Sequence, residues 1–154
     1  VSWLFGPGKA GFPEWVIRQA LTKDTVNVVS DKWGTPTSAA DIVTGLESFV
    51  FSPEPLGGVL HLTNTGSCSW QEWAQHCINC AEKAGLPLKT TKIGATTMDE
   101  LAKVAGWKAK RPRFTSMSNE KFTRFTGKEM RTWQDAVSEY VEQHLAPALA
   151  KEFA

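Results

Sequence analysis

The chain has 154 residues, of which 42% are hydrophobic and 21% charged, and this composition suits one globular domain with a sizeable core. A formal net charge of +1 gives no general reason to expect a nucleic acid or an anionic membrane as a partner. No apolar run approaches the roughly 20 residues that a membrane-spanning helix needs, and the first residues lack the basic region and cleavage site of a signal peptide. The three clustered cysteines argue against a disulfide framework and favour a reducing cytoplasm.

The spacing of hydrophobic and breaking residues predicts strands that alternate with helices. Strands are predicted at residues 1–5, 26–29, 58–63 and 89–93. Helices are predicted from apolar residues three and four apart and from capping residues, at 13–22, 39–51, 70–84, 98–105, 119–125 and 133–145. The helix at 39–51 has one apolar face. Residues 31–37 are expected to form a loop, because Gly34 and Pro36 resist regular structure.

Capping residues define several of these helix ends. Ser69 and Glu72 have the spacing of a capping box, in which each side chain accepts a hydrogen bond from the other residue's backbone N–H. Ser118 is expected to be the N-cap of the helix at 119–125. Gly106 is expected to close the helix at 98–105, and Pro147 to end the last helix.

Cys77 and Cys80 form a CxxC pair, whose thiolates could share a metal ion or a redox role. A structural zinc needs two further ligands at suitable spacing, and the sequence has no second CxxC or HxxxH. A redox pair is placed at a helix start, whereas this pair lies in the middle of a predicted helix. We therefore expect two buried cysteines that pack as small hydrophobic side chains, and no metal site.

No residue stands out as a catalytic group. His61, His76 and His144 lack a serine or cysteine partner in a nucleophile motif. Tyr140, the single tyrosine, is followed four residues later by a histidine rather than by a lysine that would lower its pKa, so we expect a core tyrosine. A glycine-rich dinucleotide fingerprint is absent, and Gly6-Pro7-Gly8 does not replace it because proline has no N–H to offer a phosphate.

Residues 108–113 carry four positive charges, on Lys108, Lys110, Arg111 and Arg113. Guanidinium groups match phosphate oxygens and lysines add charge, so this segment could bind a diphosphate. A solvated loop is the plain alternative. A nucleic-acid site is disfavoured, because the segment is short and lacks interleaved aromatic residues.

Several motifs occur in a fixed order along the chain. They are Ser-Trp-Leu-Phe-Gly-Pro-Gly from residue 2, Asp-x-x-Gly-x-Pro-Thr from residue 31, Gly-Val-Leu-His-Leu-Thr from residue 58, Gly-x-x-Ser-Trp-x-Glu-Trp-Ala from residue 66, Arg-Pro-x-x-x-Ser from residue 111 and Trp-x-x-Ala-Val from residue 133. In this order they resemble the C-terminal half of the dTDP-4-dehydrorhamnose reductase family, a branch of the extended short-chain dehydrogenases. The resemblance covers about residues 1–145.

The resemblance implies an α/β fold, namely the C-terminal part of an NAD(P)-binding Rossmann-type enzyme with mixed short strands and helices. Residues 1–51 would complete the Rossmann domain, residues 52–145 would form the substrate-binding domain, and residues 146–154 would be a tail. In the full enzyme, NADPH or NADH and a tyrosine–lysine pair belong to the N-terminal domain, and the C-terminal part binds a nucleotide sugar. Because the chain begins with Val1 rather than methionine, we expect a piece of a longer protein, without a catalytic residue or a cofactor of its own.

The resemblance also implies site residues. Trp3 matches a family tryptophan that lies against the sugar, and its flat ring suits the apolar side of a deoxyhexose. Ser2 is the residue matched to the cofactor. The remaining residues matched to the nucleotide-diphosphate pocket are Asp31, Lys32, Trp33, Thr35, Arg111 and Arg113.

Two departures from the family pattern leave alternatives open. Met117-Ser118 stands where the family usually has Leu-Asp, and residues 96–108 are longer than usual, with an inserted helix beside the site. The family also includes a non-catalytic regulatory subunit, so the chain could instead be a regulatory or protein-interaction module, or a processed fragment without function. We expect the apolar surface of residues 1–5 and 39–51 to be covered by an N-terminal part or by self-association.

Overall fold

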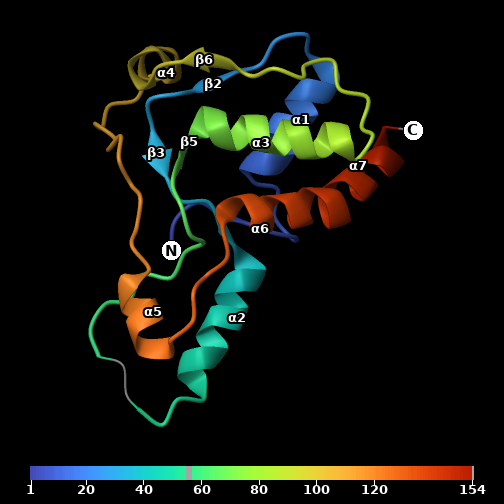
Figure 1. Ribbon diagram of the computed structural model, residues 1–154. Coiled ribbons are helices and arrows are strands. Elements are labelled where there is room, and N and C mark those ends of the chain that lie inside the picture. Colours follow the sequence, from blue (N-terminus) through green and yellow to red (C-terminus); the bar gives the residue numbers. More distant parts are fainter. Residues whose placement is uncertain (55–56, 154) are drawn as a thin grey trace.

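The computed structural model describes residues 1–54 and 57–153. The helices in these ranges are α1 (Phe12–Thr22), α2 (Ala39–Val50), α3 (Trp70–Lys83), α4 (Met98–Ala105), α5 (Glu120–Thr126), α6 (Trp133–Tyr140) and α7 (Ala146–Glu152), with a π-helical turn, η1 (Val141–Leu145), between α6 and α7. Helices α1, α3, α6 and α7 form one body, and α2 and α5 extend from it as a smaller lobe (Figure 1).

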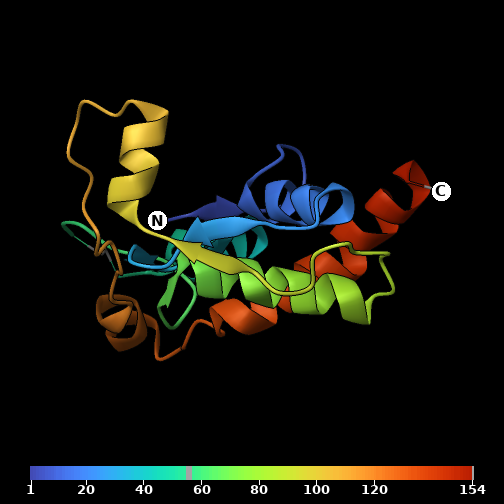
Figure 2. The same cartoon turned by 90° about the horizontal axis from the view of Figure 1, so that it is seen from above.

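The strands are short and belong to three two-stranded pairs. Their bounds are β1 (Leu4–Phe5), β2 (Asn27–Val29), β3 (Trp33–Gly34), β4 (Thr37–Ser38), β5 (Cys68–Ser69) and β6 (Gly94–Thr96). β1 pairs with β4 and β2 with β6 in parallel, and β3 pairs with β5 antiparallel. Seen from above, β2 and β6 run side by side, and α4 stands out from the body beyond the end of β6 (Figure 2).

The core lies where α1, α3 and the run from α6 to α7 meet. Its most deeply buried side chains come from the apolar faces of these helices: Val16, Ile17, Ala74, Cys77, Ile78, Val137, Val141 and Leu149. Cys80 belongs to the same cluster, which confirms that the CxxC residues pack as hydrophobic side chains. Burial raises the pKa of the Cys77 thiol, as expected for a structural cysteine.

The predicted core position of Tyr140 is confirmed, since its side chain is buried. Its hydroxyl group contacts Glu14 Oε1 and lies 3.2 Å from the Gly6 carbonyl oxygen. Burial and the neighbouring Glu14 raise the pKa of Tyr140, the opposite of what a catalytic proton donor needs.

A polar cluster ties α2 to the body. Asp41 Oδ2 accepts hydrogen bonds from Asn64 Nδ2 at 2.6 Å and from Arg131 Nε at 2.8 Å. Asn64 Oδ1 also accepts from the backbone N–H of Ser38, the N-cap of α2, at 2.7 Å. Asn64 is fully buried, so these bonds satisfy its amide and fix the start of the helix.

The capping signals in the sequence predicted helix starts and ends well. At α3, the Ser69 N–H donates to Glu72 Oε2 at 2.7 Å and the Glu72 N–H donates to Ser69 Oγ at 3.1 Å. Gly106 follows α4 with φ of 64°, the left-handed conformation expected of a C-cap glycine. At α5 the helix begins one residue later than predicted, with Asn119 as N-cap in place of Ser118.

The strand predictions were less successful. The strand predicted at 58–63 is wrong, because no described neighbour pairs with it; Asn119 Oδ1 accepts from the Thr63 N–H and Lys121 Nζ donates to the Val59 carbonyl instead. The strand predicted at 89–93 is wrong, because the strand in this region is β6, which begins at Gly94. The Lys89 N–H instead donates to the Ala20 carbonyl. Part of the predicted 31–37 loop is strand, namely β3 and β4, because distant segments supply partners that sequence spacing does not reveal.

Pro147 does not end the last helix, contrary to the prediction. The π-helical turn η1 immediately precedes α7, and Pro147 occupies the first turn of α7, where a missing N–H costs least. Residues 146–152 of the expected tail are thus helical. Ala146 and Leu149 are buried in the core.

Candidate functional site

The 31–37 segment and the basic 108–113 segment lie side by side. The Trp33 N–H donates to the Arg113 carbonyl at 2.6 Å, and the Thr115 N–H donates to the Trp33 carbonyl at 2.9 Å. These backbone bonds bring together Asp31 and Arg113, which are 82 residues apart in the sequence. Most of the charged site residues predicted from the sequence therefore meet in one region.

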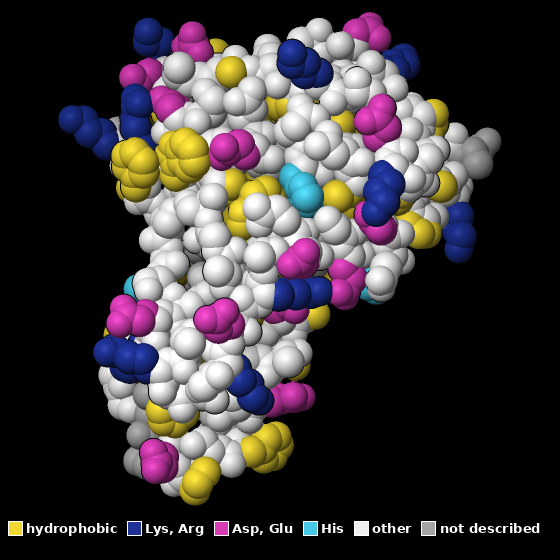
Figure 3. Space-filling model, in the orientation of Figure 1, with side chains coloured by type: hydrophobic (Ala, Val, Ile, Leu, Met, Phe, Trp, Pro, Cys, Tyr) yellow, Lys and Arg dark blue, Asp and Glu magenta, His cyan; other side chains and the backbone are white. Residues whose placement is uncertain are grey.

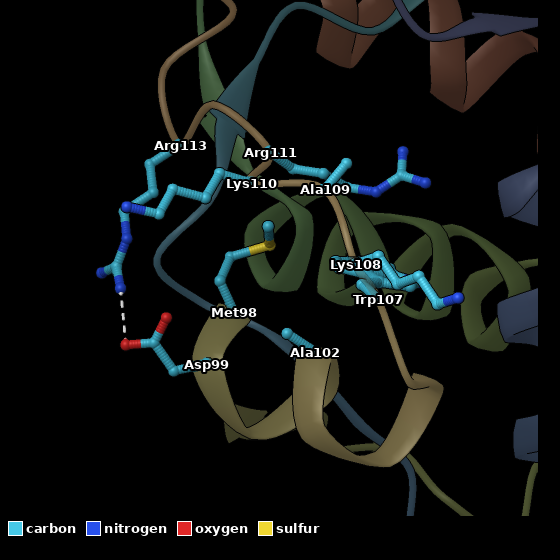
Figure 4. Close-up of a pocket in the computed structure, with 9 residues that line it drawn as sticks. All are labelled: Met98, Asp99, Ala102, Trp107, Lys108, Ala109, Lys110, Arg111 and Arg113. Carbon is cyan, nitrogen blue, oxygen red and sulfur yellow. Dashed lines mark hydrogen bonds and ion pairs between the residues drawn. The ribbon is translucent and has the colours of Figure 1, made fainter.

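Arg113 lies between two carboxylates. Its Nη1 donates to Asp31 Oδ2 at 2.6 Å, and its Nη2 donates to Asp99 Oδ2 at 3.0 Å, the bond drawn in Figure 4. The second oxygen of Asp31 accepts from the N–H of Met98, the first residue of α4, at 2.7 Å. Two nearby negative charges offset the charge of Arg113, so this residue is less suited to attract an anion than the sequence alone suggested.

Lys32 is a buried cation, with 7% of its surface exposed. Its Nζ donates to the Pro112 carbonyl at 2.7 Å and lies 5.6 Å from the centre of the Trp70 ring. Burial lowers the pKa of Lys32, and the nearby Arg111 charge lowers it further. An ammonium has three N–H donors, so donors remain beyond the bond to Pro112.

Neither Lys32 nor Arg111 forms an ion pair with a carboxylate in residues 1–54 and 57–153. The Arg111 guanidinium instead stacks over the Trp107 ring at 4.5 Å. Two neighbouring cations, one of them buried, are costly without a counter-charge. Such a pair has the chemistry to bind an anion.

A cavity of about 320 Å³ opens beside Arg111, between α4 and the basic segment, and Lys32 does not line it. Figure 4 shows Met98 and Ala102 facing it from α4, with the 107–113 chain on the other side. The lining residues are Met98, Asp99, Ala102, Trp107, Lys108, Ala109, Lys110, Arg111 and Arg113.

A second cavity, of about 270 Å³, lies beside β2 and is mainly apolar. Its walls are Phe12, Trp15, Asn27, Val28, Val29, Trp70, Thr96 and Leu101. Helix α4 contributes to both cavities, through Met98 to the first and Leu101 to the second. Trp70 lines the second cavity, and its ring centre lies 5.6 Å from Lys32 Nζ.

Trp3 packs in an aromatic cluster. Its ring is nearly parallel to that of Trp73, at 7° and 5.7 Å between centroids, and meets the Trp70 ring edge-on at 5.6 Å. The backbone of Trp3 has φ of 44°, a left-handed conformation that is unfavourable for a residue with a side chain. A Cβ atom at Gly34 would lie 2.5 Å from the Trp3 ring, so only glycine fits there.

The remaining sequence-predicted residues line neither of these two cavities. Thr35 is buried, and its Oγ1 accepts from the Met117 N–H at 3.5 Å. Ser2 is buried next to Trp3, and Trp33 is half-buried in β3. Asp31 accepts hydrogen bonds from Arg113 and from the Met98 N–H of α4, as described above.

Sequence reasoning did not identify Asp99 or Trp70 as site residues. Asp99 is an ordinary acidic residue in the first turn of a helix, and only its contact with Arg113 distinguishes it. Trp70 lies within the Gly-x-x-Ser-Trp-x-Glu-Trp-Ala motif, which marked the family but assigned no binding role to this tryptophan. The presence of an extra helix at 98–105 beside the site was the one signal that could have drawn attention to Asp99.

The smaller lobe exposes apolar side chains. Val43 and Val50 of α2 are 61% and 72% exposed, and Phe51 and Val59 are 82% and 78% exposed. Figure 3 shows hydrophobic side chains reaching the surface at the tip of this lobe. The apolar face predicted for this helix therefore points largely into solvent.

Two further findings concern the described residues as a whole. No helix in them is both long enough and apolar enough to cross a membrane. The same residues contain no group of three or more His, Cys, Asp or Glu side chains arranged to hold a metal ion.

Comparison with known proteins gives a consistent result. Residues 1–146 match the family described as RmlD substrate binding domain. The chain is 33% identical over 142 residues to the spore coat polysaccharide biosynthesis protein SpsK of Bacillus subtilis, covering 92% of this chain and 45% of that protein. It is 25% identical over 145 residues to dTDP-4-dehydrorhamnose reductase of Escherichia coli K12, covering 92% of this chain and 47% of the reductase.

Solved structures agree. A dTDP-4-dehydrorhamnose reductase from Bacillus anthracis in complex with NADP aligns with a TM-score of 0.75 at 25% identity, covering 92% of this chain and 46% of that one. The Clostridium acetobutylicum orthologue aligns with the same TM-score and coverage at 28% identity. The chain thus spans about half the length of the relatives it matches. These comparisons confirm the fold class and the resemblance that the sequence motifs indicated.

Proposed function

Since the chain belongs to the RmlD substrate binding domain family, we propose that it is the substrate-binding part of an NAD(P)H-dependent reductase of a nucleotide-linked 4-keto sugar. The observation that carries this proposal is the pair Lys32 and Arg111, two neighbouring cations without a carboxylate partner among the described residues. A nucleotide diphosphate supplies the anion that such a pair lacks.

In this proposal the diphosphate occupies the cationic cavity and the base occupies the apolar one. Trp15 and Phe12 offer flat rings on which a pyrimidine can stack, and Asn27 offers an amide for its polar edge. Lys32 is proposed to contact the diphosphate, because its Nζ bonds to the Pro112 carbonyl in the basic segment and lies next to Trp70, a wall of the apolar cavity. Trp3 stays the proposed contact for the sugar, and Trp33 and Thr35 stay proposed residues of the nucleotide-diphosphate pocket. Arg113 and Asp31 are proposed to act by positioning.

The binding proposal is tested by titrating the chain with dTDP and following heat or tryptophan fluorescence. Lys32→Met is expected to weaken binding about tenfold or more, since a charge-assisted hydrogen bond contributes about 1.5–3 kcal/mol. Lys23→Met is the matched control. Lys23 is an exposed lysine directly after α1, and it belongs to neither the 31–37 nor the 108–113 segment. Equal affinities for both variants would place the anion site elsewhere.

The cofactor is proposed to be NADPH or NADH, held by a part of the protein outside residues 1–154, and Ser2 is proposed to lie near it. When bound, the nicotinamide supplies the hydride that reduces the 4-keto group to an alcohol. This chain is proposed to bind and orient the nucleotide sugar and to have no catalytic residue of its own.

Activity is tested on the complete protein that contains this chain. Mixed with NADPH and dTDP-4-dehydrorhamnose, it is expected to oxidise NADPH, and the Lys32→Met variant is expected to raise KM more than it lowers kcat, because Lys32 would bind a part of the substrate remote from the reaction. A complete protein that binds dTDP yet reduces no nucleotide-linked ketone would support the regulatory alternative.

The exposed apolar side chains of α2 are proposed to pack against the cofactor-binding part, and in its absence against a second copy of the chain. The isolated chain is then expected to associate reversibly as its concentration rises in light-scattering measurements. A strictly monomeric chain at high concentration would contradict this. A cytoplasmic location is proposed on the ground that all three cysteines are free and buried.

A further inference from the structure

Helix α4 is attached to the body by few apolar contacts. Met98 is its single buried residue, and Val104 is 88% exposed. Figure 2 shows the helix standing out from the body beyond β6. Since packing of an apolar face normally fixes a helix in place, something else must hold α4 beside the cavity.

Polar contacts supply that attachment at the N-terminal end of α4. Asp31 accepts the Met98 N–H through one oxygen and the Arg113 guanidinium through the other, at 2.7 and 2.6 Å. Arg113 then reaches Asp99 in the first turn of the helix, at 3.0 Å. Asp31, which follows β2, is thereby linked to α4 both directly and through Arg113.

The position of α4 decides the shape of the cationic cavity. Met98, Asp99 and Ala102 form one wall, and the 107–111 segment with Arg113 forms the other. A shift of the helix would widen or close the space next to Arg111. Groups that fix α4 therefore also fix the geometry in which an anion in this cavity would meet Arg111.

We propose that Asp31, Arg113 and Asp99 form a clamp that positions α4 as the wall of the anion site, and that Asp99 is a positioning residue for the nucleotide diphosphate. This inference rests on the proposed binding function. It concerns residues that would not contact the reacting atoms. It also explains why Asp99, an acidic residue, lines the cavity in which the diphosphate is proposed to bind.

The clamp and simple electrostatics predict opposite signs for one substitution. Asp99→Asn removes a negative charge from the cavity wall, and this alone should tighten the binding of an anion. If Asp99 positions α4, the same change should weaken binding, by about threefold for a contact as exposed as this one. Asp99→Glu keeps the charge and the reach to Arg113, and is expected to retain the affinity of the original chain.

The experiment measures the affinity of the chain for inorganic pyrophosphate and for dTDP, together with hydrogen exchange of the amides of residues 99–105. In Asp99→Asn we expect weaker binding and faster exchange in α4. Glu120→Gln is the matched control, because it removes an exposed ion pair with Arg124 in α5, in the smaller lobe. High salt should speed α4 exchange in the original chain and change it less in Asp99→Asn, where only the ion pair between Arg113 and Asp31 remains to be screened.

The outcomes separate the clamp from the function on which it rests. Tighter or unchanged binding in Asp99→Asn, with the original chain binding normally, would overturn the clamp and leave the anion site intact. Failure of the original chain to bind either pyrophosphate or dTDP would overturn the proposed site itself, and with it the role of Asp99 in ligand binding. Weaker binding in Asp99→Asn that Asp99→Glu does not share, with faster exchange in α4, would support the clamp.

Discussion

Helices α3 and α4 begin with the same local signal and are held in place by different forces. Each starts with a capping box, Ser69 with Glu72 in α3 and Thr97 with Glu100 in α4. Beyond that first turn, α3 buries Trp73, Ala74, Cys77, Ile78, Cys80 and Ala81, whereas α4 buries Met98 alone. Capping decides where a helix starts, and burial decides how firmly it is held, so α3 belongs to the core while α4 depends on charges that a ligand or salt can alter.

The comparison predicts its largest effect on stability when a β-branched side chain in each helix is truncated to alanine. Ile78→Ala in α3 should destabilise the protein by about 3 kcal/mol, because the side chain is fully buried and leaves a cavity. Val104→Ala in α4 should change stability by less than about 0.5 kcal/mol, because the side chain lies in solvent. Urea unfolding of both variants measures the difference. Similar losses in the two would show that α4 is packed far more tightly than its exposure indicates.

A second prediction concerns the aromatic stack that rests on α3. Gly34→Ala places a methyl group 2.5 Å from the Trp3 ring, so the ring must leave its place against Trp73. We expect a loss of about 1–3 kcal/mol, as for overpacking in a core. The tryptophan signal in near-ultraviolet circular dichroism should fall as well. Gly127→Ala is a useful contrast, because no neighbouring atom would meet its methyl group and its cost should come from its φ of 67° alone.

Removing the N-cap hydroxyl group from each helix compares α3 and α4 through the loss of the same kind of hydrogen bond. Ser69→Ala should lower global stability by about 1 kcal/mol, because α3 unfolds only with the core. Thr97→Ala removes the same kind of hydrogen bond from α4, and should speed local hydrogen exchange there while leaving the urea midpoint nearly unchanged. A matching drop in the midpoint for Thr97→Ala would mean that α4 unfolds together with the core.

The smallest expected effect is a pH dependence at Lys32, which lies next to Trp70, the first residue of α3. Burial and Arg111 lower the pKa of Lys32 from its ordinary value of 10.5. The unfolded chain therefore keeps this proton to higher pH than the folded one, and stability should rise as pH increases through the folded pKa towards 10.5. Over the same range dTDP binding should weaken, since Lys32 loses its charge. Lys32→Met should abolish the Lys32 part of both trends, with denaturant melts and titrations as the measurements.

Helices were predictable from the sequence because their signals are local. Ser69, Glu72 and Gly106 act within one turn of the chain, and the structure confirms each of them. Strands depend on partners instead. Residues 58–63 have a strand-like composition, but no described strand pairs with them. In contrast, β3 and β4 form in a predicted loop because β5 and β1 lie beside them.

The site was predictable to the extent that motifs marked it. The loop from residue 31 and the arginines at 111 and 113 were identified from the family resemblance, and the structure brings them together. Their different charge environments were not predictable, because Arg113 is offset by Asp31 and Asp99 while Arg111 stacks on Trp107. That distinction depends on where α4 lies in space, which no local pattern specifies.

The left-handed backbone at Trp3 has a consequence for how the chain meets other chains. β1 pairs with β4 on one side, and its remaining edge, which carries the half-exposed Leu4, could template the growth of an intermolecular sheet. A residue with φ of 44° cannot continue the pleat, so the strand stops at Leu4, and Gly6-Pro7 follows its other end. An edge of two residues is too short to nucleate a fibril, and the turn at Trp3 therefore protects the chain against strand-by-strand aggregation.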